Sequence, residues 1–113
     1  MRVIYYRTSS GREPVREYFE KLPMADRARF AEDLEIISGC CSIRDLWESQ
    51  VTVRQLEGKL WEIKTGQTNK YRVYYVILTD LVMILLHACK KQGQKAAKQD
   101  LEIGAKRMRE VLS

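Results

Sequence analysis

The sequence predicts an α+β fold, in which a mostly antiparallel β-sheet carries an N-terminal helix hairpin on one face and is followed by a C-terminal helix. Two observations predict this fold. Short runs rich in β-branched and aromatic residues occur at the N-terminus and again from Val51 onward, whereas apolar residues recur at helical spacing between these runs and after Gly93. A chain of 113 residues suits one domain, which we expect to span residues 1–113.

The N-terminal part is expected to contain one strand and two helices. Residues 2–7 have strand composition and are followed by the turn signal Thr8–Gly11. Pro14 begins a helix that closes at Leu22-Pro23, and a second helix then continues to Gly39, a suitable C-cap. These helices look like a hairpin. Because they separate the first strand from the others, we expect that strand to lie beside a later strand rather than its immediate successor.

The C-terminal part is expected to form an antiparallel meander and a last helix. Its strands are predicted at Val53–Glu57, Leu60–Thr65, Tyr71–Leu78 and Leu81–Cys89, with turns at Gly58, Gly66–Asn69 and Thr79-Asp80. The last helix carries an apolar stripe of Ala97, Leu101, Ala105, Met108 and Leu112. With the helices packed on one face of the sheet, the other face is expected to be free.

The composition argues against several classes of protein. The longest apolar runs are too short to cross a bilayer, and the N-terminus lacks a signal-peptide cleavage pattern, so we expect a cytoplasmic protein without a membrane partner. Three cysteines, of which Cys40 and Cys41 are adjacent, do not suit a disulfide framework. One histidine and no Cys-x-x-Cys pair leave too few ligands for a conventional zinc site, so neither a metal nor another cofactor is expected.

The charge balance favours an anionic partner. The chain has 20 Lys+Arg against 15 Asp+Glu, a formal net charge of +5. A basic block lies between Asp80 and Asp100, without an acidic residue inside it. Its cations are Lys90, Lys91, Lys95 and Lys98. Such a block neutralises phosphates irrespective of base sequence, although a flexible basic linker is the alternative interpretation.

Alternation along the predicted strands places Lys64, Arg72 and Tyr74 on one face of the sheet, together with Glu62. Neighbouring cations repel one another unless an anion lies among them, and phosphate is the natural anion. The alternative is a solvated face on which Glu62 neutralises one cation. Either Tyr71 or Tyr74 is a candidate for stacking on a base.

His87 is the single histidine and therefore the default candidate for acid/base chemistry. By strand alternation it shares a face with Met83, Leu85 and Cys89, so its surroundings are expected to be apolar. We therefore interpret His87 as a packed core histidine rather than a catalytic one. The two tryptophans are likewise interpreted as core or helix–sheet packing residues.

Several segments occur in an order and spacing that are more specific than any of them alone. They are residues 13–19 with Leu22-Pro23, residues 55–64 (Gln-Leu-Glu-Gly-Lys-Leu-Trp-Glu-Ile-Lys), residues 71–75 (Tyr-Arg-Val-Tyr-Tyr), residues 85–91 (Leu-Leu-His-Ala-Cys-Lys-Lys) and the last helix around Glu102, Ala105 and Arg107. Together they resemble the RelE/ParE toxin superfamily, and more narrowly its phage-derived HigB-like branch, over nearly the whole chain.

This resemblance implies an mRNA interferase, a toxin that cleaves messenger RNA, commonly at the ribosome, without a metal ion. It also implies neutralisation by an antitoxin that often carries a helix-turn-helix domain. By position, Lys64 matches a site usually occupied by arginine, Arg72 matches the strand arginine, and Lys90 and Lys91 match a basic run. The further departures are Cys89 where phenylalanine is common, Gln92 where another lysine is common, and Ala96-Ala97 where Thr-Pro usually starts the last helix.

These residues suit cleavage of RNA by its own 2′-hydroxyl, which needs a base, stabilisation of the phosphoryl oxygens and a proton for the leaving oxygen. The catalytic candidates are Arg72 as a clamp on the phosphoryl oxygens, Lys64 or Lys91 as the base, and Tyr74 to orient the substrate. The candidates for RNA binding are Lys90, Lys95, Lys98 and Tyr71. Two other classes stay open: a ParE-like poison of DNA gyrase, and a non-catalytic protein of the same fold that binds RNA or a partner.

Overall fold

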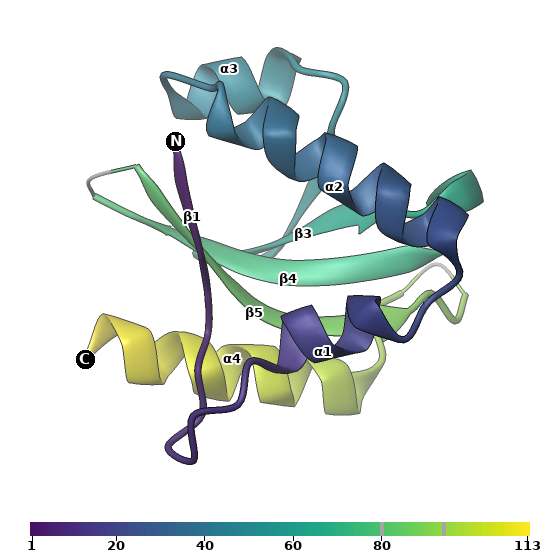
Figure 1. Ribbon diagram of the computed structural model, residues 1–113. Helices are drawn as coiled ribbons and strands as arrows, with labels where there is room; N and C mark the ends of the chain where they lie inside the picture. The colour runs from purple at the N-terminus through teal and green to yellow at the C-terminus, as the bar shows by residue number, and fades with distance from the viewer. Residues whose placement is uncertain (80, 94) are drawn as a thin grey trace.

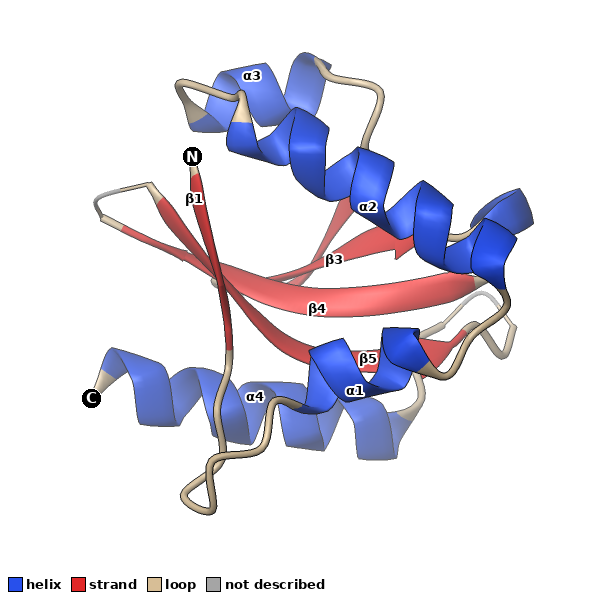
Figure 2. Cartoon of the chain, in the orientation of Figure 1, coloured by secondary structure: helices blue, strands red, loops and turns tan. Residues whose placement is uncertain are grey.

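The computed structural model describes residues 1–79, 81–93 and 95–113, which form one sheet with helices on both of its faces (Figures 1 and 2). The strands are β1 (Arg2–Tyr5), β2 (Thr52–Glu57), β3 (Leu60–Thr65), β4 (Tyr71–Leu78) and β5 (Val82–Lys90). The helices are α1 (Pro14–Glu20), α2 (Met24–Ser38), α3 (Ile43–Glu48) and α4 (Lys98–Leu112), with a 3₁₀ turn η1 (Gln67–Asn69) before β4.

The sheet has the strand order β1-β5-β4-β3-β2, in which β2 to β5 form the predicted antiparallel meander. Strand β1 pairs with β5 in parallel, so the expectation that it lies beside a later strand is confirmed. The physical reason is that α1 and α2 follow β1 and carry the chain away from the sheet before the meander begins. The predicted turn at Thr79-Asp80 includes Asp80, which lies outside the described residues.

Helices cover both faces of the sheet, and Figure 1 shows α2 on one side and α4 on the other. The prediction of a free second face is therefore wrong. Leu101, Ala105 and Met108 of α4 pack against a cluster that includes Leu60 and Leu86 of the sheet. The apolar stripe of α4 is buried against this face of the sheet, as expected for an amphipathic helix. We call the face that α4 covers the α4 face and the opposite face the α1–α2 face.

Helix α3 was not expected, because six residues are too few for an apolar repeat to be recognised. Its start does carry a local signal, since the Ser42 side chain accepts a hydrogen bond from the Asp45 backbone amide. The Trp47 ring of α3 stacks on Trp61 of β3 with 5.4 Å between centroids. The predicted helix–sheet contact of the tryptophans is therefore present, but Trp47 is 54% exposed and is not a core residue.

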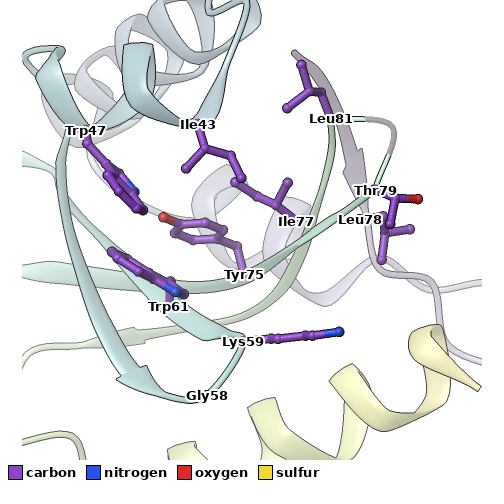
Figure 3. A pocket seen from close by; sticks show the side chains of 10 residues that line it. All are labelled: Ile43, Trp47, Gly58, Lys59, Trp61, Tyr75, Ile77, Leu78, Thr79 and Leu81. Carbon is purple, nitrogen blue, oxygen red and sulfur yellow. The ribbon is translucent and has the colours of Figure 1, made fainter.

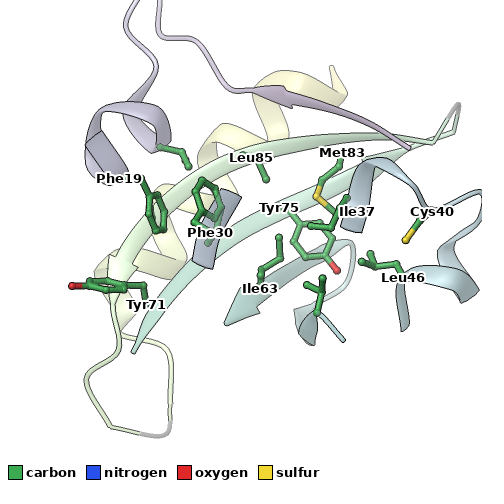
Figure 4. Close-up of a cluster of buried hydrophobic side chains, with 14 residues drawn as sticks. Phe19, Phe30, Ile37, Cys40, Leu46, Ile63, Tyr71, Tyr75, Met83 and Leu85 are labelled. Atoms are coloured by element: carbon green, nitrogen blue, oxygen red, sulfur yellow. The ribbon is translucent and has the colours of Figure 1, made fainter. Parts of the chain in front are cut away.

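The main core lies between the α1–α2 face and the two N-terminal helices (Figure 4). Phe19 of α1 and Phe30 of α2 stack on each other with 3.9 Å between ring centroids, which joins the two helices. Ile63, Tyr75 and Leu85 rise from three adjacent strands to meet the helices. This core fixes the sheet, and the sheet in turn fixes the positions of the polar side chains on its α4 face.

Helix α4 lies very close to the sheet at Gly104. A Cβ atom on Gly104 would lie 2.7 Å from the Tyr74 ring, which is nearer than real Cβ atoms approach another heavy atom. A bulkier residue would therefore push α4 away from β4. The absence of a side chain at this position allows α4 to cover Tyr74 completely.

We predict that Gly104→Ala destabilises the protein by about 1–3 kcal/mol through overpacking. At a solvent-exposed position of a helix, the same change would stabilise the protein by about 1 kcal/mol. The sign of the change in unfolding free energy therefore tests the close approach. Urea denaturation followed by circular dichroism measures the effect, with Gln99→Ala on the exposed side of α4 as a control that stays within about 0.5 kcal/mol of wild type. A more stable Gly104→Ala protein would contradict the close approach.

Candidate functional site

Polar side chains gather on the α4 face in two rows that run across the strands. Strand pairing aligns Lys64 with Arg72 and Arg72 with Cys89 in the first row. We call Lys64, Arg72 and Cys89 the Arg72 row. The second row, which we call the Glu62 row, is made of Arg54, Glu62, Tyr74 and His87. The prediction that Glu62, Lys64, Arg72 and Tyr74 share a face is confirmed.

Glu62 is the acidic centre of this surface and is completely buried. Its Oε1 lies 3.0 Å from Nη2 of Arg54, and its Oε2 lies 3.7 Å from Nε of Arg72. Arg72 is itself only 2% exposed, and its Nη2 donates a hydrogen bond of 3.0 Å to the Gly93 carbonyl oxygen. The face is therefore not solvated at these residues, although Glu62 does neutralise cations as the alternative interpretation supposed.

His87 lies on the α4 face with Cys89, so the expectation that it shares a face with Met83 and Leu85 is wrong, although its side chain is packed and only 14% exposed, as predicted. The cause is a β-bulge in β5. Tyr74 pairs with His87 but Tyr75 pairs with Leu85, which leaves an additional residue in β5 and reverses the alternation after it. Simple alternation from the sequence cannot anticipate such a reversal.

The bulge brings His87 to the first turn of α4, where its Nε2 lies 2.7 Å from Oδ1 of Asp100. A carboxylate can only accept, so Nε2 of the neutral ring is the donor. Burial lowers the pKa of His87, and the hydrogen bond to Asp100 offsets part of that decrease. His87 is therefore a neutral imidazole at pH 7. Asp100 and His87 are both site residues that the sequence reasoning did not propose.

Cys89 and Tyr74 complete this corner of the site. Burial raises the pKa of the Cys89 thiol to about 12, with the Asp100 carboxylate as a further cause. Burial also raises the pKa of Tyr74. The Tyr74 hydroxyl is enclosed, and no nitrogen or oxygen atom of the described residues is its hydrogen-bond partner; its polar neighbour is the Cys89 sulfur. Both groups are consequently protonated at neutral pH.

The predicted lysines lie around these two rows in different settings. Lys64 is half-buried on the α4 face, whereas Lys91, Lys95 and Lys98 are exposed in or near the connection from β5 to α4. Lys95 lines a shallow groove together with Arg54 of β2. Lys90 is exposed at the end of β5, but its pairing with Tyr71 directs it toward the α1–α2 face.

Tyr71 belongs to the main core rather than to the candidate site. It is 6% exposed on the α1–α2 face, and its hydroxyl donates to Oδ2 of Asp26 over 3.4 Å. This burial contradicts the prediction that Tyr71 stacks on a base. Tyr74 is on the expected face, but it lies completely beneath α4, so it does not present its ring to a ligand either.

A second concavity lies near α3 and is chemically different. Its apolar wall includes Trp47, Trp61 and Tyr75, and Lys59 also lines it (Figure 3). Among the described residues that line it, there are neither the paired cations nor the acidic residue found on the α4 face. Among the described residues, no helix combines the length and the apolar character needed to cross a membrane.

The site geometry makes the stability of the protein depend on the Glu62 charge. We predict that Glu62→Gln destabilises it by about 3 kcal/mol or more, because two arginines would lose their buried anion. Thermal or urea denaturation measures this loss, and Glu57→Gln at the exposed end of β2 is the matched control. The double variant Glu62→Leu/Arg72→Met should recover part of the stability lost by Glu62→Leu alone. Equal losses for Glu62→Gln and Glu57→Gln would contradict the role of Glu62.

Comparison with known protein families places the chain in one of them. Residues 17–109 match the family model described as "Phage derived protein Gp49-like (DUF891)". No curated protein matches the chain. The matched range includes α2 and α3, the whole meander with both polar rows, and most of α4. The chain therefore belongs to the phage-derived Gp49-like family.

Proposed function

We propose that this protein is the toxin of a type II toxin–antitoxin system and acts as an mRNA interferase, a metal-independent endoribonuclease that works on the ribosome. Membership of a phage-derived family supports the branch of the RelE/ParE superfamily to which the segment pattern points. The observation that carries the proposal is the pair of cations formed by Lys64 and Arg72 on neighbouring strands.

Lys64 and Arg72 occupy directly paired positions in β3 and β4. Like charges at paired positions destabilise a sheet unless an anion lies between them. Glu62 is shared between Arg72 and Arg54, so the two rows together carry more positive than negative charge around it. A phosphodiester would neutralise the excess. RNA supplies such groups at regular spacing, and the exposed Lys91, Lys95 and Lys98 extend the cationic surface along the connection to α4.

Arg72 contacts a substrate phosphate only if the Gly93 carbonyl oxygen gives way. That oxygen accepts from Arg72 Nη2 at 3.0 Å. A non-bridging phosphate oxygen is a stronger acceptor, because its hydrogen bond to a guanidinium joins two full charges. In this proposal the phosphate replaces the carbonyl, while Glu62 holds the guanidinium in position from the other side.

The reaction transfers protons and needs no redox partner. A base, Lys64 or Lys91 in its neutral form, removes the proton of the 2′-hydroxyl, and the resulting oxygen attacks phosphorus. Arg72 stabilises charge on the non-bridging oxygens. The bond from phosphorus to the 5′-oxygen breaks, and this oxygen takes a proton from an acid. The products are a 2′,3′-cyclic phosphate and a 5′-hydroxyl end.

The toxin would also have a protein partner, an antitoxin with a helix-turn-helix domain. An acidic segment of that partner would be attracted by the same surface that binds RNA, because both carry negative charge. Competition between the two would then neutralise the toxin. The exposed lysines of the basic block are the residues most accessible to such a segment.

One observation favours a second candidate function, a protein that binds RNA without cleaving it. Arg72 is almost completely buried and Tyr74 completely so. If the Gly93 carbonyl keeps its place, the exposed lysines bind the RNA backbone and no clamp reaches the scissile phosphate. Such binding would weaken steeply with salt, since it depends on counterion release.

We predict that wild-type protein cleaves a defined mRNA and that Lys64→Gln lowers the rate by about 10²-fold, the usual loss when one preorganised charge is removed. Arg72→Ala should abolish cleavage. The mRNA is presented both on translating ribosomes and free in solution, and cleavage sites are mapped by primer extension. The format that supports cleavage shows whether the ribosome is needed.

The matched control is Arg27→Gln, which removes an exposed cation from α2 on the opposite side of the sheet and should leave the rate unchanged. Circular dichroism checks that each variant is folded. Cleavage at the wild-type rate by folded Arg72→Ala would overturn the catalytic assignment. RNA binding without cleavage in either format would favour the second candidate function.

A further inference from the structure

A nitrogen, a sulfur and an oxygen donor meet at the junction of β5 and α4. They belong to His87, Cys89 and Asp100, and their ligand atoms all lie within 4.8 Å of one another. His87 and Cys89 come from β5, and Asp100 comes from the first turn of α4. The chain brings these three groups together only because the bulge turns His87 onto the α4 face.

We propose that His87, Cys89 and Asp100 form a binding site for a divalent transition metal ion of the zinc type. Three protein ligands leave the fourth tetrahedral position for water or another small ligand. The mixture of imidazole, thiolate and carboxylate suits Zn²⁺, whereas Mg²⁺ and Ca²⁺ prefer oxygen ligands throughout. A small opening of the contact between His87 and Asp100, 2.7 Å apart, would admit the ion between them.

The surroundings of the three donors favour a bound ion that solution can reach. The His87 side chain is 14% exposed and that of Asp100 is 25% exposed, so the cluster is neither sealed nor fully solvated. An ion can therefore reach the three donors from solution, and part of the desolvation of these donors has already occurred on folding.

Tyr74 gives an independent indication that a charged ligand belongs here. Its hydroxyl is completely buried, has no nitrogen or oxygen partner among the described residues, and lies next to the Cys89 sulfur. A thiol is a weak acceptor, whereas a metal-bound thiolate accepts a hydrogen bond well. Binding of the ion therefore gives the Tyr74 hydroxyl the acceptor that it lacks.

The charges around the cluster balance when the ion is bound. Zn²⁺ displaces the proton of the Cys89 thiol to solvent and forms a Zn–S bond. His87 binds through Nε2 once its ring proton has moved from Nε2 to Nδ1, so no oxidation or reduction is involved. The thiolate and the Asp100 carboxylate together offset the two charges of the ion. The positive charges of Arg72, near Cys89, and of Arg107, near His87, limit the affinity of the site for the ion. Glu62 neutralises part of the Arg72 charge.

A bound ion would clamp the first turn of α4 to β5. Asp100 lies on α4 only seven residues after Gly93, whose carbonyl oxygen contacts Arg72. The ion would thus hold in place the segment next to the arginine. This consequence rests on the proposed function, but the site itself does not, because it is defined by its donors and tested by binding.

The test titrates the purified, reduced, metal-free protein with Zn²⁺ by calorimetry and with Co²⁺ by absorption spectroscopy. We expect one ion per chain, a thiolate-to-cobalt charge-transfer band and tetrahedral ligand-field bands for Co²⁺, and a rise in melting temperature with Zn²⁺. Cys89→Ser and Asp100→Asn should lose the tight binding. Tyr74→Phe should weaken it about tenfold, as removal of an outer-shell hydrogen bond does, without abolishing the cobalt band.

Cys41→Ser is the matched control, because it removes an exposed thiol outside the cluster and should leave the binding intact. Circular dichroism of each metal-free variant establishes that loss of binding is not loss of folding. Failure of folded wild-type protein to bind Zn²⁺ overturns the proposal, and so does binding that persists in Cys89→Ser or disappears in Cys41→Ser. RNA cleavage enters none of these readouts, so failure of the proposed nuclease activity would leave the metal site standing.

Discussion

The burial of Glu62 between Arg54 and Arg72 is the interaction on which the α4 face depends. A fully buried carboxylate is costly unless opposite charges compensate for the loss of its water, and the guanidinium groups of Arg54 and Arg72 form ion pairs with it here. This requirement fixes the side chains of β2, β3 and β4 relative to one another. It also leaves Arg72 beneath the Gly93 carbonyl, so that the group best suited to bind a phosphate is held in place before any ligand arrives.

Helix α4 connects this ion network with the donors at its own N-terminus. Gly104 allows close contact with Tyr74, and Asp100 one turn earlier reaches His87. Packing and charge therefore act on the same element. The apolar side of α4 packs against the cluster that includes Leu60 and Leu86, and the first turn of α4 places the Asp100 carboxylate beside β5. The polar side chains beneath α4 are held in place by its packing, but a ligand of Arg72 would have to compete with the Gly93 carbonyl oxygen.

Two kinds of chemistry thus lie side by side on one face of the sheet. The proposed RNA site uses Lys64 and Arg72, and the proposed metal site uses the end of β5 and the start of α4. They share the connection from β5 to α4, which carries Gly93 and the exposed lysines. Occupation of the metal site would hold Asp100 against β5, whereas the proposed contact of Arg72 with a phosphate would require the Gly93 carbonyl to move. The two events are expected to oppose each other for that reason.

The sequence by itself determined the α+β class, the helices around their apolar stripes, the four-stranded meander and the shared face of Lys64, Arg72 and Tyr74, since periodicity and turn residues are local properties. Tertiary structure decided the rest. A bulge moved His87 from the expected core to the polar face, and α4 covered the face that was expected to be free. Tyr71 became core because two helices pack over it. Bulges and the packing of helices on a sheet depend on contacts between distant segments. They therefore cannot be predicted from alternation and composition along the chain.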